Sequence, residues 1–174
     1  MKKTFATVAG MAALTAACGG APGYSGARAT LMTADGRQAA YAEVGQDGDA
    51  IKVMIEARDL APGTYGAHLH AIGNCEAPGF DSAGPHWNPT ERAHGSENPA
   101  GPHHGDLPNL TVDASGRGTL NFRIAGASTT EGAARLFDED GAAVVIHAQP
   151  DDYRTDPSGN SGARIACGQL ARPG

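Results

Sequence analysis

The chain has 174 residues, of which 25 are Gly and 11 are Pro, and this composition fits one turn-rich domain better than two domains or a helical bundle. Its formal net charge is −6. A body of this charge is unsuited to general electrostatic binding of nucleic acid or of an anionic membrane surface.

The N-terminus has the pattern of an export signal. Lys2 and Lys3 precede a short apolar run at 5–14, and small residues follow it. A membrane span would need about 20 apolar residues, so the pattern predicts a signal peptide over 1–17. The Gly/Pro/Ser run at 18–26 is then a flexible tether, and 27–174 is the folded domain.

Cys18 follows Leu-Thr-Ala-Ala, which resembles a bacterial lipoprotein processing site, although the leucine stands one residue earlier than usual. We therefore expect lipidation of Cys18 and membrane attachment through it. Ordinary cleavage near Ala17 is the alternative. If Cys18 is set aside in the signal region, Cys75 and Cys167 remain to pair in an oxidising compartment, and two free buried thiols are the alternative.

Short extended segments with turn residues between them fill most of the domain. Two such runs flank an Asp-Gly pair, Asp35-Gly36, which is a hairpin signal. Residues 50–58 alternate between apolar and polar side chains, so one face of that strand is buried. Strands are expected at 27–33, 38–44, 50–58, 64–70, 109–113, 117–124, 142–148 and 163–170. Short strands without a persuasive helix predict an antiparallel sandwich or barrel.

The segment from Thr64 to Leu110 holds six of the seven histidines and has almost no apolar periodicity. Loops of this length inside a small domain are usually functional or tied down by something other than packing. The sequence therefore predicts a loop that folds around metal.

His68 and His70 stand at i and i+2 on an expected strand, so their rings project from one face about 6.6 Å apart. Such a pair alone is weak evidence, because it also occurs by chance on polar faces. His147, at the end of an apolar segment, can add a ligand from another strand. Several imidazoles in a tetragonal arrangement suit copper.

Four further candidates in the long loop are each flanked by Gly or Pro, as loop ligands require: His86, His94, His103 and Asp106. Three imidazoles and one carboxylate form a tetrahedral set of nitrogen and oxygen donors. Such a set suits zinc.

From HLH through SAGPHWNPTERAHG and HHGDLPNL to GAAVVIHAQPDD and GARIACG, the chain resembles the bacterial copper/zinc superoxide dismutases over residues 27–170. The resemblance implies an all-β fold, an eight-stranded antiparallel Greek-key barrel or sandwich with a long metal-binding loop and a second active-site loop. It also implies a periplasmic enzyme that converts superoxide to dioxygen and hydrogen peroxide.

The resemblance implies copper on His68, His70, His86 and His147, and zinc on His86, His94, His103 and Asp106, with His86 shared. Asp151 is implied as the carboxylate that links a copper ligand to a zinc ligand, as outer carboxylates do in metal sites. Asp152 is its rival, and a solvated loop acid is the alternative. His104 belongs to neither site, and Trp87 is expected to pack against the loop.

The resemblance further implies that copper is alternately reduced and reoxidised, and that His86 leaves the reduced metal with a proton and then returns. Arg164, three residues before Cys167, matches the arginine over copper, where a guanidinium can guide a small anion. An ordinary surface arginine is the alternative. The loop 149–162 holds Arg154 as its only cation, so weak electrostatic steering is expected.

Two other functions compete with the enzyme. One is a periplasmic copper/zinc-binding module without turnover, and the other is a structural surface domain. Both predict degenerate ligands or loss of the arginine. The sequence leaves the choice between monomer and homodimer open.

Overall fold

The computed structural model describes residues 26–171, and its regular structure is almost entirely β. The strands are β1 (Ala27–Thr33), β2 (Gln38–Asp47), β3 (Ala50–Ala57), β4 (Gly63–Tyr65), β5 (Ala67–His70), β6 (Leu110–Val112), β7 (Gly118–Ala125), β8 (Ala143–His147) and β9 (Arg164–Gln169). One short 3-10 helix, η1 (Asp81–Ala83), lies in the long loop. Among residues 26–171, no helix has the length and apolar character needed to cross a membrane.

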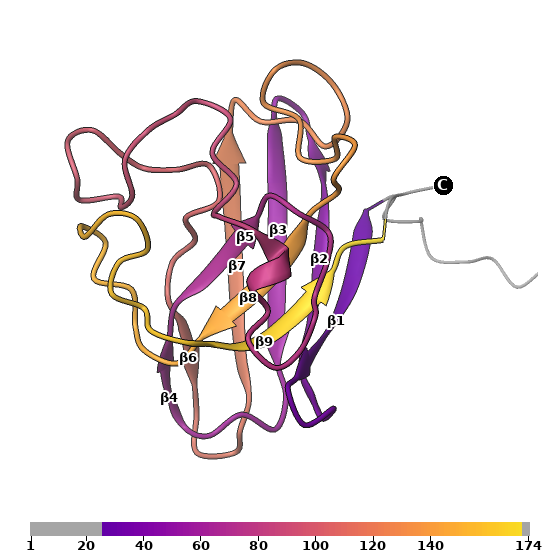
Figure 1. The fold of residues 1–174 in the computed structure, drawn as a ribbon, viewed down its shortest axis with the longest axis vertical. Coiled ribbons are helices and arrows are strands. Elements are labelled where there is room, and N and C mark those ends of the chain that lie inside the picture. The colour runs from indigo at the N-terminus through magenta and orange to yellow at the C-terminus, as the bar shows by residue number, and fades with distance from the viewer. Residues whose placement is uncertain (1–25, 172–174) are drawn as a thin grey trace, which may run out of the picture.

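Seven strands form one curled sheet in the order β5-β8-β9-β1-β2-β3-β7, and β4 pairs with β6 beside it (Figure 1). Every pairing between these strands is antiparallel. Strands far apart in sequence, such as β1 and β9, are neighbours, so long connections cross the ends of the sheet as in a Greek key. The predicted all-β antiparallel class is confirmed.

Strand β3 shows why the sequence folds this way. Ile51, Val53 and Ile55 are fully buried, whereas Lys52 between them is exposed. Residues two apart on a strand share a face, so the alternating sequence places one face in the core. Burying one such side chain stabilises the fold by about 1.5 to 3 kcal/mol.

Strand β8 is buried on both faces, which explains its unbroken apolar sequence. Val144 and Ile146 belong to the main core, while Val145 faces a second cluster that contains Phe80 and Cys167. Phe80 comes from the first part of the long loop, and the other members named here lie on β8 and β9, so the loop covers the outer face of β8 (Figure 1).

The expectation of one continuous strand at 64–70 was wrong. This segment forms two strands, β4 and β5, which belong to different sheets and are separated by Gly66. A Cβ atom on Gly66 would lie 2.9 Å from the Cβ atom of Ser161 and 3.3 Å from the carbonyl oxygen of Gln149. The chain can change sheets here because glycine allows that close approach.

The predicted signal peptide and Cys18 lie outside the described residues, as does the predicted tether up to residue 25. Lipidation and export therefore remain predictions.

Candidate metal centre

The long loop between β5 and β6 is held against β5 by backbone hydrogen bonds. The N–H of Leu69 donates to the carbonyl of Gly105 (2.9 Å), and the N–H of Trp87 donates to the carbonyl of Leu69 (2.8 Å). A third bond joins the Gly105 N–H to the Trp87 carbonyl at 2.8 Å. Trp87 is 5% exposed and packs in the main core, and its ring also lies 5.4 Å from that of the loop residue His104, which is the packing expected from the sequence. The histidines that flank these bonds are thereby brought beside the sheet.

Four buried histidines form a first group in which one potential ligand atom from each lies within 4.8 Å of the others: His68, His70, His86 and His147. His68 and His70 lie on β5, and His147 ends the neighbouring strand β8. His86 comes from the loop and forms an isolated bridge with His70. The structure therefore brings the four predicted copper candidates together.

The rings of this group leave four nitrogens that fit a metal ion. In three of the rings, the nitrogen that faces away from the group has a hydrogen-bond partner. His68 Nε2 lies 2.8 Å from Asp151 Oδ2. His70 Nδ1 donates to the Gly84 carbonyl at 2.9 Å, and His147 Nδ1 donates to the Gly162 carbonyl at 3.2 Å. The other nitrogens are buried without a hydrogen-bond partner: His68 Nδ1, His70 Nε2, His86 Nε2 and His147 Nε2. Unpaired buried nitrogens are costly, and a metal that favours imidazole would satisfy all four.

A second group consists of His86, His94, His103 and Asp106. Asp106 Oδ1 lies 2.9 Å from His86 Nδ1, 3.0 Å from His94 Nδ1 and 3.2 Å from His103 Nδ1. The other oxygen, Oδ2, accepts the backbone N–H of Gly95 at 2.9 Å and that of His103 at 3.0 Å. Three ring nitrogens around one carboxylate oxygen match the donor set of a tetrahedral zinc site.

His86 belongs to both groups. Its Nδ1 faces Asp106 and its Nε2 is one of the unpartnered nitrogens of the first group. One imidazole therefore has a nitrogen available to each of two ions.

A buried carboxylate, that of Asp151, links the two groups from outside. Its Oδ2 lies 2.8 Å from His68 Nε2 and its Oδ1 lies 3.0 Å from His94 Nε2. The rival residue, Asp152, instead accepts hydrogen bonds within its own loop, from Thr155 and Asn160. The structure therefore places Asp151, and not Asp152, between the two groups.

Asn109 was not singled out from the sequence, and it fixes the backbone of Asp151. Its Nδ2 donates to the Asp151 carbonyl at 2.9 Å, and its Oδ1 accepts the Asp151 N–H at 2.8 Å. The signal that could have found it is its position in GDLPNL, directly after the metal-loop residues.

The charges of the metal-free centre follow from burial and from the carboxylates. Burial lowers the pKa of His86 to about 4 and that of His147 to about 3, so both are neutral at pH 7. Burial also opposes the charged form of His94, but the carboxylates of Asp106 and Asp151 outweigh it and raise its pKa to about 9. Hydrogen bonds from the histidines likewise outweigh burial and hold the pKa of Asp106 well below its usual range.

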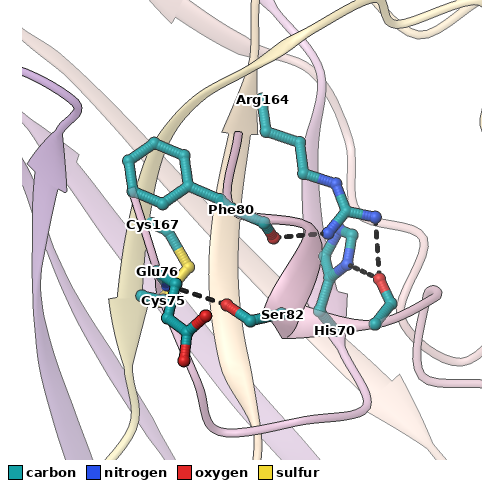
Figure 2. Close-up of a disulfide and its surroundings, with 8 residues drawn as sticks. His70, Cys75, Glu76, Phe80, Ser82, Arg164 and Cys167 are labelled. Carbon is teal, nitrogen blue, oxygen red and sulfur yellow. Dashed lines mark hydrogen bonds between the residues drawn. A yellow bond between two sulfur atoms is a disulfide. The ribbon is translucent and has the colours of Figure 1, made fainter. Parts of the chain in front are cut away.

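Arg164 begins β9 and reaches the rim of the first group (Figure 2). Its Nη1 donates to the Phe80 carbonyl at 2.6 Å, and its Nη2 donates to the Gly84 carbonyl at 2.8 Å. The Gly84 carbonyl also accepts His70 Nδ1–H, so Arg164 and His70 share an anchor. Two of the five guanidinium donors are accounted for in this way, and the others can serve an anion.

Cys75 and Cys167 form a disulfide, as predicted (Figure 2). Their Cα atoms are 5.7 Å apart and their sequence separation is 92. The bond joins the start of the long loop to β9, on which Arg164 also lies. The loop that carries Phe80 and Gly84 is thus tied to the strand that carries Arg164.

An antiparallel Greek-key sheet that carries two groups of candidate metal ligands, with one histidine in both, is the architecture of an all-β protein built to hold two metal ions. Residues 38–170 match the family described as copper/zinc superoxide dismutase, and the chain belongs to this family, whose members use copper and zinc.

Named relatives cover most of the chain. It is 43% identical over 143 residues to the superoxide dismutase-like protein YojM of Bacillus subtilis, covering 80% of this chain and 73% of that protein. Copper/zinc superoxide dismutase 1 of Aquifex aeolicus is 40% identical over 142 residues, covering 80% of this chain and 84% of the relative. A crystal structure of a superoxide dismutase-like protein from B. subtilis aligns with a TM-score of 0.78 at 41% identity, covering 83% of this chain and 97% of the other.

Proposed function

We propose that this protein is a superoxide dismutase that oxidises one superoxide to dioxygen and reduces another, with two protons, to hydrogen peroxide. The observation that carries the proposal is the first group, four buried and unpartnered imidazole nitrogens beside a half-buried arginine. A redox metal and a cation for an anionic substrate would thus share one site.

In this proposal His68, His70, His86 and His147 hold copper, and His86, His94, His103 and Asp106 hold zinc. Copper, when bound, supplies one-electron redox chemistry, which no side chain of the group can supply alone. The donor sets support the assignment, because four imidazoles suit copper and a carboxylate with three imidazoles suits zinc.

Arg164 would bind and orient superoxide. Its guanidinium is permanently charged and is held by two loop carbonyls, so its remaining donors have a fixed direction. A small anion beside His70 could accept one of them, because His70 and Arg164 share the Gly84 anchor.

His86 would hold and release a proton at Nε2, its nitrogen in the first group. Its opposite nitrogen, Nδ1, would be a ligand of the second group beside Asp106, and that ligation would keep the ring in place. In this arrangement Nε2 is the nitrogen of His86 that can take up a proton and give it to a reduced oxygen species.

A metal-binding module without turnover is the second candidate. It is kept because the relative at 43% identity is named a superoxide dismutase-like protein, and not a superoxide dismutase. Such a module would bind both metals and would not accelerate superoxide decay.

The test is stopped-flow decay of superoxide with the purified chain loaded with copper and zinc. We expect decay to accelerate, and Arg164→Ala to lower the rate constant by about 10- to 100-fold, as loss of a charged hydrogen bond predicts. Arg154→Ala is the matched control, because Arg154 pairs with Glu97 and contacts neither group, and it should change the rate by less than about twofold. Inactivity with both sites filled would refute the enzyme and leave the binding module.

We also propose export to the periplasm, with 1–17 as signal peptide and a lipid anchor at Cys18. The disulfide supports an oxidising compartment. Mass spectrometry of the mature N-terminus tests both parts, since a lipidated cysteine, a simple cleavage and an uncleaved chain differ in mass.

A further inference from the structure

Asp156, in the loop between β8 and β9, contacts two residues of the second group. Its Oδ1 accepts the backbone N–H of His94 at 2.6 Å. The same oxygen lies 3.9 Å from His103 Nε2. Neither metal group contains Asp156.

The contact with His103 places a negative charge behind that ring. His103 turns Nδ1 inward, 3.2 Å from Asp106 Oδ1, so Nε2 is its outer nitrogen and carries the proton when Nδ1 binds a metal. A ligated imidazole gives up electron density, which makes its outer N–H more positive. A carboxylate near that N–H stabilises the bound state.

His94 and His68 have Asp151 at their outer nitrogens, and Asp156 stands on the corresponding side of His103. Asp151 and Asp156 belong to the same loop, five residues apart. The loop 149–162 thus faces the second group with two carboxylates, at two different rings.

A seam of contacts between the two loops holds Asp156 in place. The Glu97 N–H donates to the Tyr153 carbonyl at 3.0 Å, and Asn98 Nδ2 donates to the Arg154 carbonyl at 3.4 Å. The side chains of Arg154 and Glu97 also form an ion pair, but both are exposed, so this pair adds little to those two contacts. The hydrogen bonds to the Tyr153 and Arg154 carbonyls fix the chain just before Asp156, and the bond from the His94 N–H holds its carboxylate beside the second group.

We infer that Asp156 is a positioning residue of the zinc site, holding His94 through its backbone and supporting His103 through its charge. The inference rests on the zinc assignment proposed above. It gives the loop 149–162 a role in zinc affinity that is separate from substrate steering.

The test is the zinc dissociation constant of the full chain, measured by chelator competition. Asp156→Asn keeps an oxygen for the His94 N–H and removes the charge. We expect zinc to bind about tenfold more weakly in this variant at low salt, the lower end of what loss of an outer partner costs. Because 57% of the Asp156 side chain is exposed, the difference should shrink at high salt. The copper spectrum should not change.

Glu97→Gln is the matched control. It neutralises an acid of the same seam whose side chain pairs with Arg154, so zinc affinity should stay at the wild-type value. Asp156→Ala, which also loses the backbone contact, should bind zinc more weakly than Asp156→Asn.

Wild-type zinc affinity in Asp156→Asn would overturn the inference. So would an equal loss in Glu97→Gln, or a loss that does not change with salt, because either would show only that the seam keeps the loop folded. The variant Asp106→Ala distinguishes failure of the Asp156 inference from failure of the zinc assignment. If the wild type binds no zinc, or Asp106→Ala binds it unchanged, the assignment itself fails.

Discussion

His94 lies between the carboxylates of Asp106 and Asp151, and this arrangement predicts a proton released on zinc binding. Those carboxylates raise its pKa to about 9 against the effect of burial, so the ring is charged at pH 7 in the metal-free protein. Zinc binds neutral imidazole, so its binding at pH 7 should release about one proton, and affinity should rise about tenfold per pH unit from 7 to 9. Calorimetry in buffers of different ionisation enthalpy measures the proton. No release at pH 7 would show that His94 is already neutral.

At the scale of single residues, the sequence predicted the candidate metal ligands better than the residues that hold those ligands in position. Histidines and an aspartate at loop spacings indicate metal by their own chemistry, and the structure brings both predicted sets together. Asn109 and Asp156 act through contacts between segments more than 40 residues apart, and composition and periodicity carry no signal of such contacts.

At the scale of loops, Gly159 predicts how closely the second loop must approach the centre. It has φ +64°, and a Cβ atom there would lie 1.9 Å from Asp151 Oδ1 and 2.7 Å from His94 Nε2. Gly159→Ala should therefore displace Asp151 and weaken zinc binding by at least about tenfold, the effect of losing an outer carboxylate. The measurement is again chelator competition.

Gly48→Ala is the control for backbone strain. Gly48 has φ +63° but meets nothing within 4 Å, so this variant should lose about 1 kcal/mol of stability and keep its zinc affinity. Equal zinc affinities in the two variants would contradict the close approach.

The disulfide is the other link between elements. Because it joins residues 92 apart, replacing both cysteines by serine should lower the free energy of unfolding of the metal-free protein by roughly 4 to 5 kcal/mol in the chain-entropy model. The loop that carries the Phe80 carbonyl would also lose its tie to the Arg164 strand. Guanidinium unfolding measures the first effect. A change under about 1 kcal/mol would show that other contacts already order the loop.

Strand positions were largely predictable because they depend on local alternation, as in β3. The split of the expected 64–70 strand was not, because it depends on how near Gly66 comes to Ser161, a residue of another loop.

At the scale of the whole molecule, the distribution of charge determines how fast an anionic substrate would reach the proposed site. Superoxide dismutases are themselves a known example of steered association. Here the chain carries −6, and Arg154, the only cation of the second loop, pairs with Glu97. We expect the rate constant for superoxide decay by the metal-loaded protein to fall by no more than about twofold from low to physiological salt. Stopped-flow decay at several ionic strengths measures it. A steep fall would show strong steering by cations of the surface.

The central claim is that two metals share His86, and binding of both metals to His86→Ala tests it most directly. Its Nδ1 lies 2.9 Å from Asp106 Oδ1, and its Nε2 is buried and unpartnered. Removal of the ring should therefore weaken zinc binding and shift the copper spectrum together, measured by titrating one preparation with each metal. A change in one metal alone would contradict a shared ligand.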